Sequence, residues 1–289
     1  MAKTTTMTAP SPAGDVVTEK PRPTREPRPP RTAGAMSWWS GLLLRVALVS
    51  AAIGLWQLAH IAEVGRPVVV QSPGSVWTAL VDYATGDVLW TNFWATIQPT
   101  LITLCLAAVV GIPIGLMLGL LPRTERVISP FISALNSMPR IALAPIFIII
   151  FGIDTAAKVA LAFSIVVFIT LLNARAGVNA ADPEALRMMT TLGASKTQTI
   201  RKVILPAAVP SILAGLRLAL IYSLLGVITS ELIASRDGLG QLIATNAGVF
   251  NLANVYAILV VLILTATMLN LLFETVERRL TRWQPPTTR

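Results

Sequence analysis

Long apolar segments separated by short polar stretches fill most of the sequence after residue 36. The hydrocarbon core of a bilayer is about 30 Å thick, so a helical span needs about 20 apolar residues. On this basis the pattern predicts six membrane-spanning helices, near residues 41–61, 97–120, 128–151, 156–174, 207–232 and 254–273. The third is interrupted by Asn136-Ser137-Met138-Pro139-Arg140, whose proline removes a helical hydrogen bond. We therefore expect an all-α integral membrane protein with a weak point in its third span.

Three segments lie outside this pattern. Residues 1–36 are rich in Pro, Thr, Ala and Arg and lack the apolar side chains that offset the entropy cost of ordering, so they predict a disordered tail. Residues 284–289 form a second tail, which leaves a transmembrane domain of residues 37–283. Residues 73–96 are too polar to span but carry regularly spaced aromatic side chains. They predict either a helix along the membrane surface or a plain loop.

Composition supports the membrane class and excludes several others. Hydrophobic residues make up 54% of the 289 residues and charged residues 13%, against roughly 25% charged in a soluble domain. The net charge of +9 does not predict nucleic-acid binding, because the basic residues lie in the tail and between apolar runs. One histidine and one cysteine provide neither a metal site nor an acid–base pair, and no Gly-x4-Gly-Lys-Ser/Thr phosphate loop is present. The chain is therefore not expected to be an enzyme.

Lysine and arginine residues gather on one side of the predicted spans. Seventeen lie in the N-terminal tail, in the loops 122–127 and 173–206 and at the C-terminal end. Only Arg66, Lys158 and Arg236 fall on the other side. Because cytoplasmic loops carry the excess of basic residues, we expect both termini in the cytoplasm and the chain in the inner (cell) membrane.

The long loop of residues 175–206 carries signals for a first short helix. Asp182 can cap a helix that starts at Pro183, and Gly193 can end it in the left-handed conformation. This helix carries an apolar patch, formed by Leu186, Met189 and Thr190 with Leu192 nearby. The patch predicts either docking onto a partner protein or packing back onto the chain's own bundle.

A second short helix is predicted in the same loop. Ser195, followed three residues later by Gln198, has the form of a capping box. We expect this helix to run to Val203 and to stop before Pro206.

Arg140 is a charged residue within a predicted span, where it needs a partner or a cavity. Together with Asn136 and Ser137 it could offer hydrogen-bond donors to an anion in transit. The alternative is that it pairs with backbone carbonyls freed by Pro139.

Two more ionisable residues lie in the fifth span, Arg217 and Glu231. Fourteen residues at 1.5 Å each separate them by about 21 Å, too far for an ion pair. Arg217 is expected to reach the inner end of the span or to contact carbonyls there. Glu231 is expected to meet the following loop with Asp237, Gly238 and Gly240, which would either gate the outer mouth or anchor the surface.

Gly111, Gly115 and Gly119 repeat at four-residue spacing on the second span. Such spacing lets another helix approach closely. The stripe predicts packing in the core of the chain or at a dimer contact, with lining of a transport path as the alternative.

Taken together, the motifs resemble the binding-protein-dependent permeases of ATP-binding-cassette (ABC) importers, in their nitrate/sulfonate/taurine branch. Gly193, followed after nine residues by Val203 and then Leu205-Pro206, is similar to the cytoplasmic signature loop of that family. Further similar segments occur in the family's order, namely Ser72-Pro-Gly-Ser-Val76, Gly111-Ile-Pro-Ile-Gly-Leu-Met-Leu-Gly119, Leu192-Gly-Ala-Ser195, Gly215-Leu-Arg217, Ser230-Glu231 and Gly238-Leu-Gly240.

The resemblance implies a permease subunit that works as a homodimer and imports a small solute delivered by an external binding protein. A separate cytoplasmic ATPase would bind ATP and Mg²⁺, so that this chain needs no cofactor, and membrane lipid would surround it. The residues implied for coupling to the ATPase are Glu184, Ala185, Arg187, Met189, Gly193, Ala194, Val203, Leu205 and Pro206. The residues expected along the path or at a gate are Asn136, Ser137, Pro139, Arg140, Glu231, Gly238 and Gly240.

One departure from the family concerns the ATPase contact. The chain has Arg187-Met188-Met189 where the family carries Glu-Ala-Ala, and its nearest match, Glu184-Ala185, lies three residues earlier. Either Glu184 replaces the acidic contact from one turn away, or the partner surface has changed its charge to suit Arg187. The competing functions are a stand-alone secondary transporter, which would normally show inverted repeats and more spans, and a membrane scaffold.

Overall fold

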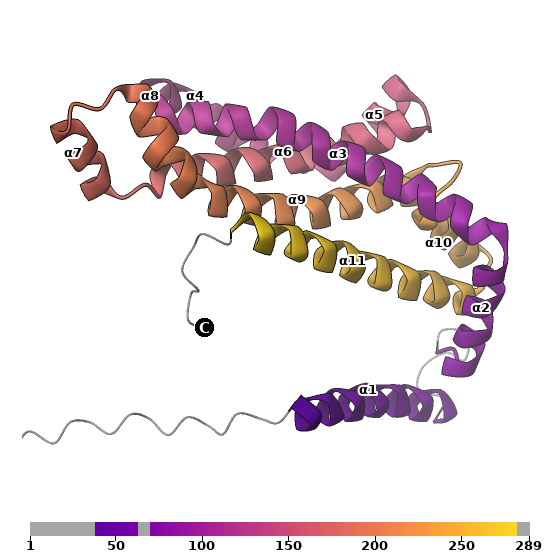
Figure 1. The fold of residues 1–289 in the computed structure, drawn as a ribbon. Coiled ribbons are helices and arrows are strands. Elements are labelled where there is room, and N and C mark those ends of the chain that lie inside the picture. The colour runs from indigo at the N-terminus through magenta and orange to yellow at the C-terminus, as the bar shows by residue number, and fades with distance from the viewer. Residues whose placement is uncertain (1–37, 63–69, 282–289) are drawn as a thin grey trace, which may run out of the picture. The chain divides into compact units, whose positions relative to one another are not determined.

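Helices form nearly all of the described part of the chain, which in the computed structural model comprises residues 38–62 and 70–281 (Figure 1). The tails predicted at residues 1–36 and 284–289 lie outside these ranges. The chain divides into two units after Ser50. Helix α1 (Trp38–Ile61) crosses that division, so the arrangement given below is that of the second unit without α1.

The remaining helices follow one another with short connections. They are α2 (Pro73–Thr85), α3 (Asp87–Leu120), α4 (Pro122–Ser137), the 3-10 turn η1 (Arg140–Leu143), α5 (Ala144–Phe151), α6 (Thr155–Asn179), α7 (Pro183–Thr191), α8 (Lys196–Thr199), the π-helical turn η2 (Ile200–Ile204), α9 (Leu205–Ile233), α10 (Leu239–Gly248) and α11 (Leu252–Leu280).

Five helices within the described ranges are long and apolar enough to cross a membrane, namely α1, α3, α6, α11 and the continuous helix from Lys196 to Ile233. A sixth candidate is the pair formed by α4 and the η1–α5 segment, which is bent by 77°. The bend falls at the predicted weak point, because Pro139 cannot donate a backbone hydrogen bond and η1 restarts the helix after it. The expected all-α membrane fold with about six spans is therefore confirmed. The limits of the bilayer along each helix stay a prediction.

Helices α3, α6 and α9 pack side by side at the centre of the bundle (Figure 1). Each contributes a fully buried small or branched side chain there, Ala107, Val166 and Ala219 respectively. Small side chains at the crossing allow the helix backbones to approach, which is how membrane helices gain packing contacts without a hydrophobic driving force.

The glycine stripe of α3 faces α6. A Cβ atom added at Gly115 would overlap the carbonyl oxygen of Leu171, and one added at Gly119 would lie 2.6 Å from the Cβ atom of Val178. The stripe is therefore occupied by packing within the chain, as the first alternative predicted.

Residues 73–96 are helical and do not form a plain loop. Ser72 caps α2, since its Oγ accepts a hydrogen bond from the backbone N–H of Ser75 at 3.1 Å. Helix α3 already begins at Asp87, so the last ten residues of the segment extend the second span. The aromatic spacing thus belongs to two helices, and the prediction of one separate helix was wrong in its C-terminal part.

The sequence predicted that the second short helix would stop before Pro206, and this prediction was wrong. Instead α8 continues through η2 into α9. In η2 the backbone N–H of Leu205 donates to the carbonyl of Ile200, five residues back, so the hydrogen-bond register widens just where proline provides no donor. The widened turn lets the helix pass the proline unbroken.

Candidate functional site

Helix α7 is closed at both ends by local hydrogen bonds. The Asp182 side chain accepts from the backbone N–H of Glu184 at 2.9 Å. At the other end Gly193 has a φ of +67°, its N–H donates to Thr190 O at 3.1 Å, and the N–H of Ala194 donates to Met189 O at 3.0 Å. This pair of bonds is a Schellman motif, which requires a left-handed residue that glycine adopts freely. The helix and its caps are therefore as predicted.

The start of α8 is fixed in the same local way. The backbone N–H of Ser195 donates to Gln198 Oε1 at 2.8 Å, and the N–H of Gln198 donates to Ser195 Oγ at 3.3 Å. These reciprocal bonds form the capping box expected from the sequence. The two short helices thus keep their shape by their own caps.

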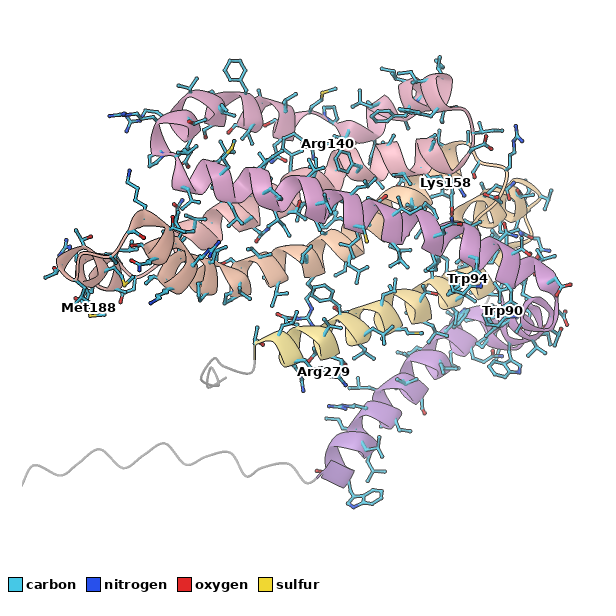
Figure 2. All side chains as sticks on the ribbon, turned by 45° about the horizontal axis from the view of Figure 1, so that its top comes forward. Trp90, Trp94, Arg140, Lys158, Met188 and Arg279 are labelled. Atoms are coloured by element: carbon cyan, nitrogen blue, oxygen red, sulfur yellow. The ribbon has the colours of Figure 1, made fainter. Side chains whose placement is uncertain are left out.

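Apolar side chains of the α7 segment lie open to the surroundings. None of its residues is buried, and Met188 and Leu192 are 59% and 72% exposed. Figure 2 shows Met188 at the tip of the α7 end, opposite the end that carries Trp90 and Trp94. Of the patch predicted from the sequence, Leu186 and Met189 are half-buried, whereas Thr190 and Leu192 are exposed. Met188, which was not predicted, adds to the exposed apolar surface.

The other residues predicted to contact an ATPase are spread over α7 and the start of α9. Glu184 and Arg187 are both exposed. Those that are half-buried are Ala185, Ala194, Val203 and Pro206, and Leu205 is 36% exposed. Helix α7 itself therefore presents one acidic side chain, Glu184, and one basic side chain, Arg187, beside Met188.

Arg140 links the break between α4 and α5 to α6 by hydrogen bonds. Its Nη2 donates to Leu135 O at 3.1 Å and to Asn136 Oδ1 at 3.0 Å, and its Nη1 donates to Ile165 O at 3.4 Å. The guanidinium also lies 4.4 Å from the centre of the Phe168 ring, a cation–π contact. Two of its acceptors are backbone carbonyl oxygens. This geometry agrees with the alternative that Arg140 pairs with backbone carbonyls near Pro139.

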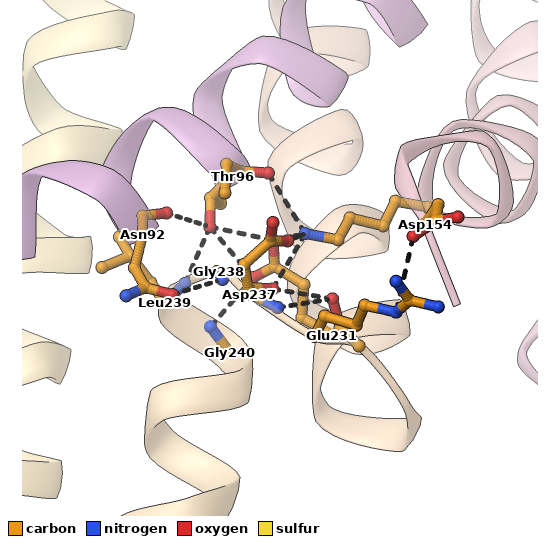
Figure 3. Close-up of polar contacts among 12 residues, drawn as sticks. Asn92, Thr96, Asp154, Glu231, Asp237, Gly238, Leu239 and Gly240 are labelled. Carbon is orange, nitrogen blue, oxygen red and sulfur yellow. Dashed lines mark hydrogen bonds and ion pairs between the residues drawn. The ribbon is translucent and has the colours of Figure 1, made fainter. Parts of the chain in front are cut away.

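A cluster of polar side chains surrounds Lys158 (Figure 3), which lies at the opposite end of the bundle from Met188 of α7 (Figure 2). Its centre is Lys158 in the first turn of α6, which is 1% exposed. The Lys158 ammonium donates to Glu231 Oε1 at 3.0 Å, to Asp237 Oδ1 at 2.8 Å, to Asp237 O at 2.9 Å and to Ala95 O at 3.2 Å. One positive charge thus meets two carboxylates.

The N-terminus of α10 is held by side chains of α3 and α9 (Figure 3). Three successive N–H groups donate to three separate acceptors: Gly238 to Asn92 Oδ1 at 2.6 Å, Leu239 to Thr96 Oγ1 at 2.9 Å and Gly240 to Glu231 Oε2 at 2.9 Å. The first N–H groups of a helix have no partner within it, and a carboxylate at this position also interacts favourably with the helix dipole. Glu231, itself 1% exposed, therefore links α10 to Lys158.

Two glycines allow the backbone to come this close to a carboxylate. Gly238 has a φ of +113°, and a Cβ atom there would overlap the Glu231 carboxyl group. A Cβ atom on Gly240 would lie 2.7 Å from Ile228 O. The structure therefore brings together Glu231, Gly238 and Gly240, whose role at a gate stays a prediction.

Lys158, Asn92 and Thr96 were missed by the sequence reasoning. Lys158 was counted with the external basic residues, but it is buried and paired. The available signal was its place near the start of the apolar run from residue 156, where a charge is costly without a partner. Thr96 and Asn92 gave no comparable signal, because their partners lie more than a hundred residues away in the chain.

The predicted path residues fall into two groups. Arg140 and its neighbours Asn136, Ser137 and Pro139 lie at the break in the third span. The Glu231 group lies near Lys158, whereas Arg140 contacts the Ile165 carbonyl. Lys158 and Ile165 are seven residues apart on α6, a distance of roughly 10 Å along the helix. They are separate sites within one bundle.

Arg217 also differs from expectation. It binds carboxylates of α11, with Nη2 3.3 Å from Glu274 and Nη1 3.6 Å from Glu277, and its Nε donates to Asn270 at 3.1 Å. Of the two expectations, contact with carbonyls was wrong, because acidic side chains near the C-terminal end of α11 lie within reach. That the side chain reaches the inner end of its span stays a prediction.

Removing the charge of Lys158 alone should destabilise the protein strongly. Lys158→Met leaves the Glu231 carboxylate buried without its counter-ion, a loss of about 3–5 kcal/mol in the free energy of unfolding. The double variant Lys158→Met/Glu231→Gln, which buries no charge, should recover most of that loss. Unfolding of purified protein in detergent measures both, with Lys196→Met at an exposed lysine as the control. A double variant as unstable as the single one would show that the charge pairing is not what matters.

Comparison with known proteins agrees with this architecture. The family described as binding-protein-dependent transport system inner membrane component matches residues 111–283. The chain is 30% identical over 246 residues to the taurine transport system permease protein of Escherichia coli (83% of this chain, 89% of that protein). It is 29% identical over 248 residues to a Bacillus subtilis protein described as a transport permease for aliphatic sulfonates (86% and 88%). Its fold is similar to that of a chain of the MetNI methionine ABC transporter in inward-facing conformations, with a TM-score of 0.60 at 19% identity (72% of this chain, 99% of that chain). The chain therefore belongs to the family of binding-protein-dependent transport system inner membrane components, the permeases of ABC importers.

Proposed function

We propose that this permease imports a small organic or inorganic anion, such as a sulfonate, taurine or nitrate, and that it does so as a homodimer. An external binding protein delivers the solute. A separate cytoplasmic ATPase subunit binds ATP and Mg²⁺ and provides the energy, while this chain contributes no catalytic residue and no cofactor. The taurine and aliphatic sulfonate permeases among its relatives support the choice of solute.

The observation that carries the proposal is the exposed apolar surface at α7. Met188 and Leu192 are largely exposed on a short helix with rigid caps, beside the charged Glu184 and Arg187. Apolar side chains on a helix that projects into water are stabilised when a partner groove covers them. A cytoplasmic ATPase is the partner that an ABC importer requires at this position.

The proposed orientation of the chain in the membrane rests on the basic residues at the α7 end of the bundle. The basic residues described at the α7 end include Arg123, Arg126, Arg201, Lys202 and Arg279. Because cytoplasmic loops are rich in Lys and Arg, this end is proposed to face the cytoplasm. The basic residues near both ends of the sequence favour the same side for the termini. The α10 end then faces the binding protein.

The charged contact with the ATPase falls to one of two exposed residues. Glu184 lies in the first turn of α7, three residues before Arg187, so the two can face the same partner surface. An ATPase with a basic rim would use Glu184, and one with an acidic rim would use Arg187.

A stand-alone secondary transporter is not favoured. Such a protein couples transport to ions through intramembrane carboxylates. Here the buried carboxylate, Glu231, is already bound by Lys158, Thr96 and Gly240.

Uptake into proteoliposomes tests the proposal as a whole. The permease, its ATPase and its binding protein should together import labelled taurine or another sulfonate, and vanadate, which traps ABC ATPases, should abolish the uptake. Uptake that persists with vanadate and without ATP, driven by an ion gradient, would instead identify a secondary transporter.

Leu192→Asp should weaken docking of the ATPase without harming the fold. Leu192 is 72% exposed, so its own chain loses little, whereas an apolar contact in the partner cleft is replaced by a charge. We expect the amount of ATPase that co-purifies to fall at least about tenfold, the effect of roughly 1.4 kcal/mol. Thr197→Asp places the same charge in the first turn of α8, where a helix tolerates it, and serves as the control. Equal co-purification of the two variants would rule out Leu192 as a docking residue.

Arg140 should act on the rate of transport and on stability, not on solute affinity. Arg140→Lys keeps the charge but loses the fork that serves Leu135 O, Asn136 and Ile165 O, a cost of about 1.5–3 kcal/mol. Arg140→Gln should behave similarly, with an unchanged KM for the solute. A large rise in KM for Arg140→Gln but not for Arg140→Lys would instead show that the positive charge at this position binds the anion.

A further inference from the structure

We propose that residues 234–238, which join α9 to α10, form a latch that opens and closes the α10 end of the permease, and that the buried Lys158–Glu231 pair is its fixed base. The structure holds this latch closed. The inference rests on the proposed function only in that opening belongs to the transport cycle.

The ion pairs of this region divide by exposure into a fixed part and a releasable part. The side chains of Lys158 and Glu231 are 1% and 0% exposed. Asp237 is 57% exposed, and the outer pair Arg236–Asp154, at 3.8 Å, is 70% and 66% exposed. Exposed pairs contribute little and exchange readily with water, whereas breaking a buried pair is costly. Opening is therefore expected at Asp237 and Arg236.

Opening in this way leaves no buried charge without a counter-ion. The Lys158 ammonium has three protons and four acceptors, so it can release both Asp237 oxygens and keep Glu231 Oε1 and Ala95 O. When α10 moves away, Glu231 loses the Gly240 N–H but keeps Lys158 and the Thr96 hydroxyl. The base stays a neutral pair in both states, and water can reach the freed groups of the latch.

The latch is built to move as a unit. Within it, the Ser235 hydroxyl donates to Asp237 O at 2.7 Å, so the turn is held by its own bond. Its two ends are changes of backbone direction: α9 ends at Ile233 with Ala234 extended, and Gly238 has a φ of +113° that other residues rarely adopt. A rotation at these two ends lifts the segment without unwinding α9.

Lifting the latch would uncover part of the apolar core. Leu239, the first residue of α10, is 0% exposed and packs with Leu89 of α3 and with Ile258 and Leu262 of α11. Because its N–H is bound to Thr96, Leu239 leaves this cluster only if the α10 cap opens. Its accessibility therefore reports the state of the latch.

Thiol labelling tests the latch without solute or ATP hydrolysis. Leu239→Cys is introduced in the background Cys105→Ser, which removes the only native cysteine, and its reaction with a water-soluble maleimide is followed in the purified protein. Adding Asp237→Asn should raise the labelling rate about two- to fivefold, the range in which a partly exposed ion pair shifts an equilibrium. Asp82→Asn, the same change at an exposed position of α2, should leave the rate unchanged. Equal rates with and without Asp237→Asn overturn the proposal, and Ile258→Cys is the second probe where Leu239→Cys lowers the folded yield.

Crosslinking tests whether the latch must open during transport. Cysteines at Asp154 and Arg236, in the same Cys105→Ser background, are joined by a short bifunctional methanethiosulfonate. Uptake should fall at least about tenfold and return with a reductant, as for a lid that gates turnover. Each single cysteine treated with the reagent is the control. Full uptake by the crosslinked protein overturns the latch. Absence of uptake from the untreated protein counts against the proposed function instead, and the labelling result still decides the latch.

Discussion

A charge that lies among apolar helices must find its partner within the protein, because neither lipid nor the core can solvate it. Lys158 meets this constraint with acceptors from three other segments: Ala95 of α3, Glu231 of α9 and Asp237 of the α9–α10 connection. These acceptors lie 3.2, 3.0 and 2.8 Å from the same ammonium nitrogen. One side chain therefore links α3, α6 and α9 at this end of the bundle. The same carboxylate that neutralises Lys158 also caps α10, so that helix is placed by the same constraint.

The requirement for internal partners also explains the irregular parts of the other helices. Pro139 breaks the third span and frees carbonyl groups there. Arg140 donates to one carbonyl at the break, Leu135 O, and to one carbonyl of α6, Ile165 O. Pro206 has no backbone N–H to donate, but the π-helical turn before it widens the hydrogen-bond register, so the helix continues past the proline. Near the α7 end, Arg217 draws on Glu274 and Glu277 of α11. At Arg140 and Arg217 another helix provides a partner for the charge, whereas at Pro206 the backbone itself adjusts.

Features of the sequence that depend on nearby residues could be predicted, and those that depend on distant ones could not. The apolar runs predicted α3 and α6, and the capping residues Asp182, Gly193 and Ser195 predicted α7 and α8, since their partners lie within five residues. Lys158 was misplaced because its partner Glu231 is 73 residues away. The continuation of the helix through Pro206 was missed because proline was taken to end the helix. The sequence did not reveal the π-helical hydrogen-bond register of the turn before it. The Glu231–Gly240 contact could be predicted, since only nine residues separate them.

One continuous helix joins the α7 loop to the buried cluster at the other end of the bundle. The helix from Lys196 to Ile233 has 38 residues, roughly 55 Å at 1.5 Å per residue, and carries the α7 loop at its start and Glu231 near its end. Communication between two distant sites needs a connecting element that both sites can bias. In the proposed complex, a displacement of the α7 loop by the ATPase would reach Glu231 through this continuous backbone. The η2 turn and Pro210 are the points along this helix where the backbone can bend, so they set how much of the displacement arrives. Glu231 of the buried pair thus lies on the same helix that carries the α7 loop at its start.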